Sequence, residues 1–482
     1  MADTTTHRGA SAAGTTGTTG QSAATATGQS AAAATGQSAA VAQEASGAAR
    51  EAAGESPALG ELRAWLATNW DPDLSVGEWW ERLGLAGWAA PALPEDAYGR
   101  GLSRTDAIDA AQIIADAGAL GAPAGLGLLL AAPTIVAHGT RAQIDRYVRA
   151  IVTGQQGWCQ LFSEPAAGSD LAGLQTRAVK DGDEWIVNGQ KVWTSGGQYA
   201  DMGMLLARTD PDVPKHQGIT WFAFDMHQPG VEVRPLREMT GQALFNEVFL
   251  TDARVAADAA IGPVHGGWAV ANTTLAAERA GLGSGAGGVG ATAIPGTVAG
   301  NLERRAGDVV DAGRTRGETS GSHLRRVDAR LLAELARALG RIDDPVVRQG
   351  LARLYTWGEL GRFNSLRLKA VTEAGGDIPA MPNIAKLSMS HIVRLGRDLG
   401  LQIAGPAGLL HGYDPAGQAS LAGRIHPLVR VVTEAALLAQ APPIYGGTDQ
   451  IQRNILAERV LGLPKEPGPD RTTPFSALPR NG

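Results

Sequence analysis

The chain has 482 residues, of which 19% are charged and 44% hydrophobic, and its formal net charge is -6. These values are ordinary for a soluble globular protein, and the acidic excess argues against a nucleic-acid-binding protein, which usually carries basic patches. The single cysteine, Cys159, excludes an internal disulfide and is compatible with a reducing compartment. No apolar run approaches the roughly 18 residues that a membrane-spanning helix needs, so we expect no membrane span and a cytoplasmic protein.

Residues 1–56 are predicted to form a disordered, low-complexity tail. Small and polar residues dominate, and Gly-Gln-Ser-Ala-Ala recurs from Gly20, Gly28 and Gly36. Such a segment cannot bury enough apolar surface to offset the entropy lost on ordering. It lacks the apolar stretch of a secretory signal, and its only lysine or arginine residues are Arg8 and Arg50, unlike a transit peptide.

Residues 57–158 are predicted to form an N-terminal α-helical domain. Apolar residues recur there at helical spacing in two sets, Leu59, Leu62, Trp65 and Leu66, and then Ala110, Ile113 and Ile114.

Residues 159–258 are predicted to form a small antiparallel β domain, because short apolar runs alternate with Gly and Pro. Asn188-Gly189 lies between two such runs, and this dipeptide predicts a two-residue hairpin turn.

Helical periodicity returns at Gly267, and residues 259–470 are predicted to form a C-terminal α-helical domain, followed by a tail at 471–482. Asp344-Pro345 is typical of a helix start, with a carboxylate cap and proline at the first helical position. The polar, Gly-rich segment from Ala306 to Ser322 is predicted to be a loop. Helices, then strands, then helices indicate an α+β protein.

Two segments nearly three hundred residues apart carry the strongest functional signal. The first is Phe162–Asp170 (FSEPAAGSD), and the second begins at Pro443 and continues through Ile444–Arg453 (IYGGTDQIQR) to Pro464. Together they resemble the flavin-binding signatures of the acyl-CoA dehydrogenase family, and the resemblance extends from near Gly84 to Pro464. It implies an α+β fold with an N-terminal helical domain, a middle small β-barrel and a C-terminal helical bundle. It also implies FAD as cofactor and dehydrogenation between the α and β carbons of an acyl-CoA.

The resemblance implies specific ligand contacts. Ser163 matches a position at the flavin edge, Trp193 matches an indole beside the flavin, and Ser195 matches a hydroxyl that reaches toward N5. Taken singly, each has an ordinary alternative, a core indole or a turn hydroxyl. The full set of implied FAD contacts is Gln160, Phe162, Ser163, Gly168, Ser169, Trp193, Thr194, Ser195, Gln402, Gly405, Gly447, Thr448 and Gln450. The implied substrate contacts are Ser169, Arg279 and Tyr445.

The segment Gln402–Gly408 resembles the stretch that holds the adenosine half of a neighbouring subunit's FAD. We therefore expect a homo-oligomer, a dimer or tetramer, with a hetero-oligomer as the alternative. An Arg-x-x-Phe-Gly motif of many family members is missing, since the chain reads Arg304-Arg305-Ala306-Gly307 instead. Arg304, Arg305 or Arg348 are candidates to replace its contacts.

The catalytic base is the main departure from the family pattern. Gly446 stands where many members carry the catalytic glutamate, and glycine cannot abstract a proton, although its N–H could still donate to the thioester carbonyl. Glu278 falls where isovaleryl-CoA dehydrogenases carry their base, on a helix and directly before an arginine. Among alanines this carboxylate would be partly desolvated, with a raised pKa. The alternative is a surface glutamate or a structural ion pair.

The function expected is FAD-dependent oxidation of an acyl-CoA to the trans-2-enoyl-CoA, with electrons passed to an electron-transfer flavoprotein. Alternatives are an FAD-contributing subunit of a heteromeric dehydrogenase, a flavin monooxygenase or nitroalkane oxidase of the same fold, and a non-catalytic binding protein. The nine histidines show no pair at metal-ligand spacing, so no metal site is expected. The glycines at 283, 285 and 288 match a dinucleotide-binding fingerprint formally, but they follow a helical pattern and not a strand.

Overall fold

The structure, a computed structural model, describes residues 56–284, 293–316, 327–465, 467 and 472–479. The chain divides into two compact units, residues 1–61 and 62–482. Of the first unit, only Ser56 and the start of α2 are described, so the predicted disordered tail otherwise lies outside the described residues. The architecture below belongs to the second unit.

Helices predominate up to Val152. α3 begins with a capping box, in which the Ser75 hydroxyl accepts from the Glu78 amide and the Glu78 carboxylate accepts from the Ser75 amide. Leu62 and Ile113, two of the predicted apolar positions, are buried. The elements are α2 (Pro57–Asn69), α3 (Val76–Leu85), η1 (Glu95–Ala97), α4 (Arg104–Asp116), η2 (Gly127–Ala131), α5 (Ala132–His138), α6 (Arg141–Gln143), η3 (Ile144–Val148) and α7 (Arg149–Val152).

The middle of the chain forms one sheet, with the order β6-β7-β3-β2-β4-β5-β8 and with β1 paired to β4. The prediction of an antiparallel sheet is wrong in part, because β1 runs parallel to β4 over four residue pairs. The intervening β2–β3 hairpin provides the long crossover that a parallel pair requires. The strands are β1 (Trp158–Leu161), β2 (Arg177–Asp181), β3 (Glu184–Ser195), β4 (Met202–Arg208), β5 (Ile219–Asp225), β6 (Val231–Leu236), β7 (Phe245–Ala256) and β8 (Ala260–Ile261).

The predicted hairpin turn at Asn188-Gly189 is wrong, since both residues lie inside β3. The β2–β3 turn falls instead at Gly182, which has φ +60°. The Asn188 side-chain amide donates to the Asp252 carboxylate at 2.9 Å, beside a register shift between β3 and β7. Gly189 permits a close approach of the next strand, because a Cβ there would come 2.4 Å from Oγ1 of Thr176. The dipeptide thus serves strand contact and not a turn.

Helices return from Gly267. α12 begins as predicted, with the Asp344 carboxylate accepting from the amides of Val346 at 2.9 Å and Val347 at 3.4 Å. Apolar side chains from α11, α12, α13 and α15 share one core. The elements are α8 (Gly267–Ser284), α9 (Ala306–Arg316), α11 (Ala329–Ala338), α12 (Pro345–Glu373), α13 (Met381–Ala404), η7 (Gly405–Leu409), α14 (Pro415–Leu421), α15 (Pro427–Leu438), α16 (Asp449–Ile455) and η8 (Leu456–Val460).

The predicted loop from Ala306 to Ser322 is wrong in its first part, which is helix α9. Ala306, Val309 and Val310 are buried, and they give this short polar segment an apolar face. Arg305 fixes its start through ion pairs with Asp73 at 2.5 Å and with the first turn of α9. Residues 317–322 lie outside the described residues, as do the glycines at 285 and 288.

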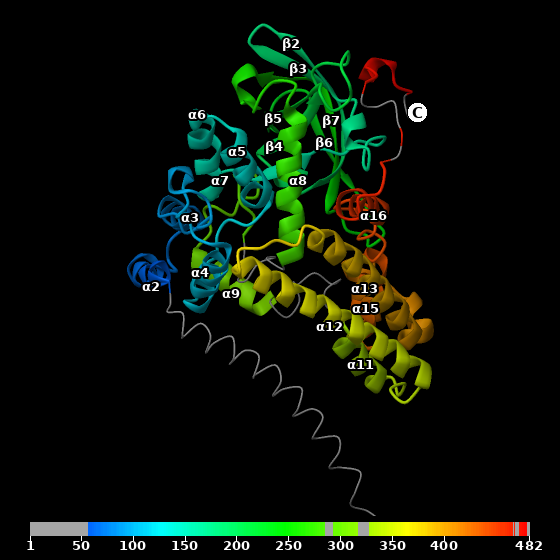
Figure 1. The fold of residues 1–482 in the computed structure, drawn as a ribbon. Helices are drawn as coiled ribbons and strands as arrows, with labels where there is room; N and C mark the ends of the chain where they lie inside the picture. The colour runs from blue at the N-terminus through cyan, green and yellow to red at the C-terminus, as the bar shows by residue number, and fades with distance from the viewer. Residues whose placement is uncertain (1–55, 285–292, 317–326, 466, 468–471, 480–482) are drawn as a thin grey trace, which may run out of the picture. The chain divides into compact units, whose positions relative to one another are not determined.

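α8 occupies the centre of the second unit, as Figure 1 shows. It contacts β5 of the sheet, α5 of the N-terminal helices and α13 of the C-terminal helices. Helices, then one sheet, then helices follow one another along the chain, as the predicted α+β class requires. Within the described ranges, no helix combines the length and the apolarity that crossing a membrane requires.

Candidate active site

Glu278 lies on α8 and faces β1. Its carboxylate accepts a hydrogen bond from Nε2 of Gln160 at 3.4 Å, which links α8 to the strand that leads into the first signature. Burial raises the pKa of Glu278 above the ordinary glutamate value, while the Gln160 hydrogen bond and the Arg279 charge act in the opposite direction. A carboxylate with a raised pKa, held by one long hydrogen bond, is suited to accept a proton near neutral pH.

Arg279 follows Glu278 on α8 and is also partly buried. Burial lowers its pKa, the Glu278 charge raises it, and the Arg459 charge lowers it further. Arg459 belongs to η8, the turn after α16, so the C-terminal part of the chain reaches this end of α8. The predicted base and the predicted substrate-binding arginine are therefore brought together with a second positive charge.

A buried ion pair fixes the first signature from beneath. Lys191 of β3 is fully buried and donates to the Glu164 carboxylate at 2.8 Å and to the Phe162 carbonyl at 3.1 Å. The same carboxylate accepts hydrogen bonds from the two amides that precede β2. Burial raises the pKa of Glu164, but the Lys191 charge and these hydrogen bonds outweigh it, so the pKa lies below its usual value. The pair therefore holds the backbone on both sides of Ser163.

The predicted flavin contacts on β3 lie on both sides of the strand. Trp193 is 61% exposed, and its φ of +62° is a conformation that bulky residues rarely adopt. The Phe245 ring packs edge-on against the indole, with 5.9 Å between the ring centroids. Ser195 is also exposed, whereas the Thr194 side chain is fully buried. An indole and a hydroxyl therefore face outward together, and Thr194 offers only its backbone to a ligand on that side.

The remaining predicted contacts of the first signature also include both buried and exposed residues. The Phe162 side chain is buried and Ser163 is partly buried, with its carbonyl accepting from the Val192 amide at 2.9 Å. Gly168 and Ser169 are exposed, and nothing lies within 4 Å of a Cβ built at Gly168.

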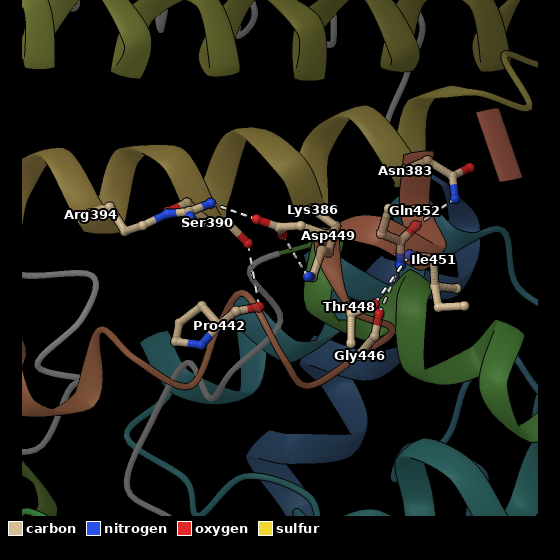
Figure 2. Close-up of polar contacts among 10 residues, drawn as sticks. All are labelled: Asn383, Lys386, Ser390, Arg394, Pro442, Gly446, Thr448, Asp449, Ile451 and Gln452. Carbon is tan, nitrogen blue, oxygen red and sulfur yellow. Dashed lines mark hydrogen bonds and ion pairs between the residues drawn. The ribbon is translucent and has the colours of Figure 1, made fainter. Parts of the chain in front are cut away.

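The second signature forms a turn before α16, and a buried carboxylate fixes it to α13 (Figure 2). Asp449 is 4% exposed and accepts from Lys386 at 3.0 Å and from Arg394 at 2.5 Å. Burial raises the pKa of Asp449, but hydrogen bonds from Lys386 and Ser390 and the charges of Lys386 and Arg394 outweigh it, so the pKa is lowered. Thr448, predicted to contact the cofactor, caps α16 with its hydroxyl.

Gly446 and Gly447 shape this turn. Their φ angles of +62° and +78° fall in the left-handed region, which favours glycine. The Gly446 carbonyl accepts from Nε2 of Gln452 at 2.8 Å, and the Gln452 side chain is held by Asn383 of α13 at 2.6 Å (Figure 2). The backbone at Gly446 is therefore rigidly placed. Tyr445 and Gln450 of the same turn are exposed.

Gln402 and Gly405 lie apart from the other predicted contacts. They are at the C-terminal end of α13, where the Gln402 carbonyl accepts from Arg341 at 2.8 Å. At 1.5 Å per residue, Gln402 lies about 28 Å along the helix from Asn383, which supports the second signature. The structure therefore does not bring these two residues to the second signature of the same chain.

Sequence reasoning missed the buried charges that support both signatures. These residues are Glu164, Lys191, Arg208, Lys386 and Asp449. Arg208 follows the apolar run of β4 and Lys191 precedes Val192-Trp193, and a charged residue beside such a run is the signal that could have indicated burial. In the described part of the chain, no three His, Cys, Asp or Glu side chains are placed to hold a metal ion.

The outward face of β3 fits FAD. A planar apolar ring with a polar edge requires a flat apolar surface beside hydrogen-bonding groups, and Trp193 with Ser195 provides both. The exposed indole of Trp193 is the observation that supports this fit, because a side chain of this size is usually buried. Gln160, Ser163 and Ser169 would add polar contacts from the first signature.

Comparison with known proteins identifies the family. Models of the acyl-CoA dehydrogenase N-terminal, middle and C-terminal domains match residues 30–155, 159–253 and 329–461. The acyl-CoA dehydrogenase IpdE1 of Mycobacterium tuberculosis is 35% identical over 391 residues, which cover 80% of this chain and 88% of IpdE1. The acyl-CoA dehydrogenase FadE34 of the same organism is 36% identical over 416 residues, or 86% of this chain, and the match spans 49% of FadE34.

Two solved structures share the fold. The ChsE4-ChsE5 complex from Mycobacterium tuberculosis matches with 27% identity and a TM-score of 0.59, over 86% of this chain and 99% of that chain. A structure described as the Tcur3481-Tcur3483 steroid ACAD matches with 26% identity and a TM-score of 0.61, over the same shares. The chain therefore belongs to the acyl-CoA dehydrogenase family. Members of this family are oxidoreductases that use FAD.

Proposed function

We propose that this protein is an acyl-CoA dehydrogenase that oxidises an acyl-CoA to the trans-2-enoyl-CoA, with Glu278 as the catalytic base. The observation that carries the proposal is the Glu278 carboxylate. It is partly buried on α8, its pKa is raised by burial, and Gln160 places it beside the strand that leads into the first signature. The cytoplasm is the proposed location.

The residues divide the reaction between them. Glu278 takes the proton from the α carbon, and the Gly446 N–H donates a hydrogen bond to the thioester carbonyl oxygen, which stabilises the developing negative charge. FAD, when bound, supplies the acceptor for the β hydrogen and its electron pair. Trp193, Ser163, Ser195, Gly447, Thr448 and Gln450 hold FAD, while Ser169, Arg279 and Tyr445 bind the substrate.

We propose bulky, ring-bearing acyl groups as the substrate class. One structural relative is described as a steroid ACAD. In this chain Gly446 has no side chain where many family members carry a glutamate. The missing side chain at Gly446 leaves room for a substituent larger than a straight chain. An electron-transfer flavoprotein is the proposed electron acceptor.

We propose that the protein works as an oligomer. Tyr355, Phe363 and Leu366 of α12 are each more than half exposed and fall within about 80° of one another around the helix. Exposed apolar faces of this kind mark protein interfaces. Gln402 and Gly405, which lie far from this chain's own second signature, would then contact the FAD of a neighbouring subunit.

A heteromeric enzyme is the second candidate. One structural relative is described as a complex of two differently named proteins, ChsE4 and ChsE5. The missing Arg-x-x-Phe-Gly motif and the engagement of Arg305 with Asp73 leave fewer residues here to hold the outer half of FAD. In this arrangement a partner chain would complete the cofactor site.

An anaerobic titration tests these proposals: acyl-CoAs are added to the purified protein and its visible spectrum is recorded. The panel should contain straight-chain, branched and steroid-derived thioesters. Loss of the oxidised-flavin bands with a ring-bearing acyl-CoA is expected, and Glu278→Gln should retain the bands with the same substrate. A colourless protein that becomes yellow only with a partner chain would support the heteromer. A yellow protein that no acyl-CoA bleaches would contradict dehydrogenation.

A further inference from the structure

A short segment near the C-terminus, Thr472–Leu478, lies against the connection between β4 and β5. We refer to it as the C-terminal strap. Pro474 forms an isolated β-bridge with Pro214. The Phe475 amide donates to the Val213 carbonyl at 2.9 Å, and the Ser476 amide donates to the Pro211 carbonyl at 2.8 Å. The Ser476 hydroxyl donates to the Asp212 carboxylate at 3.1 Å. The strap therefore has a defined backbone placement on the β domain.

The strap covers a buried cation with an aromatic ring. The Phe475 ring stacks on the Arg208 guanidinium, with 3.8 Å between the ring centroid and Cζ. Arg208 is 2% exposed, and burial lowers its pKa to about 10, while the carboxylates of Glu164 and Asp170 raise it. A cation–π contact is stronger when the cation is withdrawn from water, as this one is.

Arg208 also contacts the segment that follows the first signature. Its Nη2 donates to the Ala172 carbonyl at 2.6 Å and to the Leu174 carbonyl at 3.3 Å, and its Nη1 donates to the Lys215 carbonyl at 2.6 Å. Lys215 in turn contacts both carboxylate oxygens of Asp170 at 2.9 Å. The strap, two cations and the loop that carries Ser169 thus form one continuous chain of contacts.

We propose that Phe475 is a positioning residue, which acts through Arg208 to hold the loop at residues 168–174 in its ligand-binding conformation. The ligand side of this inference rests on the proposed function, because Ser169 of that loop is the proposed contact to FAD and to the thioester arm. The loop is otherwise exposed at Gly168 and Ser169, and neither amide donates a hydrogen bond to another described residue. Its placement therefore depends on the anchors at Asp170, Ala172 and Leu174.

Hydrogen exchange of the purified full-length protein, without added ligand, tests the structural half. In Phe475→Ala, amides of residues 168–176 are expected to exchange about tenfold faster, while those of α13 keep the wild-type rate. Phe475→Tyr, which keeps a ring over Arg208, should restore slow exchange. Ser476→Ala is the matched control, because it removes one exposed hydrogen bond of the strap and leaves the ring in place. Unchanged exchange in Phe475→Ala would overturn the proposal.

Steady-state kinetics and FAD titration test the ligand half. Phe475→Ala is expected to raise the KM for the acyl-CoA or the Kd for FAD by about tenfold, with kcat at saturation within about twofold of wild type. A lowered kcat with unchanged KM and Kd would overturn this half. If the wild-type protein bleaches with no acyl-CoA, the proposed function fails, and the exchange result still decides the role of the strap.

Discussion

Two regions of this molecule bury carboxylates, and they treat the charge in opposite ways. Glu164 and Asp449, which support the two signatures, each pair with one buried lysine and accept further hydrogen bonds, and their pKa values are lowered. On α8, Glu278 has a neutral amide at 3.4 Å and a neighbouring arginine, and its pKa is raised. Burial is common to both regions, so the partners decide the outcome.

The difference separates support from chemistry. A buried carboxylate that is fully paired stays ionised and fixes the backbone around it, as Glu164 does for Ser163. A buried carboxylate that is poorly paired keeps a high affinity for protons, which a general base requires. The comparison predicts that substitutions in the first region change stability and that substitutions in the second change turnover.

The largest effect is expected from Glu278→Gln. Because glutamine cannot accept the α proton, flavin reduction by the acyl-CoA should slow by about 10³-fold. Stopped-flow absorbance without oxygen measures this rate directly. Glu184→Gln, which removes a surface carboxylate paired with Arg254 near the β2–β3 turn, is the control and should react at the wild-type rate. Wild-type turnover in Glu278→Gln would remove Glu278 as the base.

Lys191→Met tests the paired carboxylate of the first region. It leaves Glu164 buried without its cation, and the free energy of unfolding is expected to fall by about 3–5 kcal/mol, measured by urea denaturation. The double variant Lys191→Met with Glu164→Leu should recover much of this loss, since no buried charge then remains unpaired. Equal losses in the single and double variants would show that the ion pair does not account for the effect.

The two regions should also give opposite dependence of stability on pH. Glu278 has a raised folded-state pKa, so between the ordinary glutamate value and that raised value the folded state holds a proton that the unfolded state has lost. Stability therefore falls as pH rises through this window. Asp449 has a lowered pKa, so its contribution is present above the ordinary aspartate value and is lost as pH falls toward the folded value.

Urea midpoints measured across a pH series separate the two contributions. Glu278→Gln should remove the loss on the side of rising pH, and Asp449→Asn should remove the loss on the acid side. A variant whose midpoints run parallel to wild type through its own window would show that its carboxylate does not carry the predicted shift.

The smallest effect is expected from Gln160→Leu. The hydrogen bond from Gln160 lowers the pKa of Glu278, so its removal should raise that pKa and move the acid limb of the kcat/KM profile to higher pH. A single long hydrogen bond accounts for about 1 kcal/mol, so turnover at the optimum pH should change by less than about tenfold. Gln190→Leu, which removes a similar hydrogen bond from β3 to Glu247 of β7, serves as the comparison variant. An acid limb at the wild-type position would show that Gln160 does not set the pKa of Glu278.

Local chemistry predicted some of the structure well. The start of α12 followed from Asp344-Pro345, because a cap and its amides are close in sequence. The resemblance at Phe162–Asp170 and Pro443–Arg453 indicated the fold class, and it named Glu278 before its burial was known. These features depend on short segments whose chemistry can be read in place.

Other features depended on partners far along the chain. Asn188-Gly189 has the composition of a turn, but contacts with Asp252 and Thr176 keep it in a strand. Neither the charge network at Lys191 nor the strap at Phe475 could be predicted, because each pairs residues whose proximity only the fold creates. The helix α9 was missed because its apolar face is only a few residues wide.

The bulge in β3 has a consequence for insertions and deletions. Between Lys191 and Thr194 this strand has one residue more than β7. Lys191 at the start of the bulge faces inward, whereas Trp193 within it and Ser195 after it face outward. Adding or removing one residue within Lys191–Thr194 would turn the indole into the core or the ammonium group into solvent. The turn at Gly182 carries no such constraint. Length variation among natural or engineered relatives should therefore be tolerated at Gly182 and be absent from the bulge.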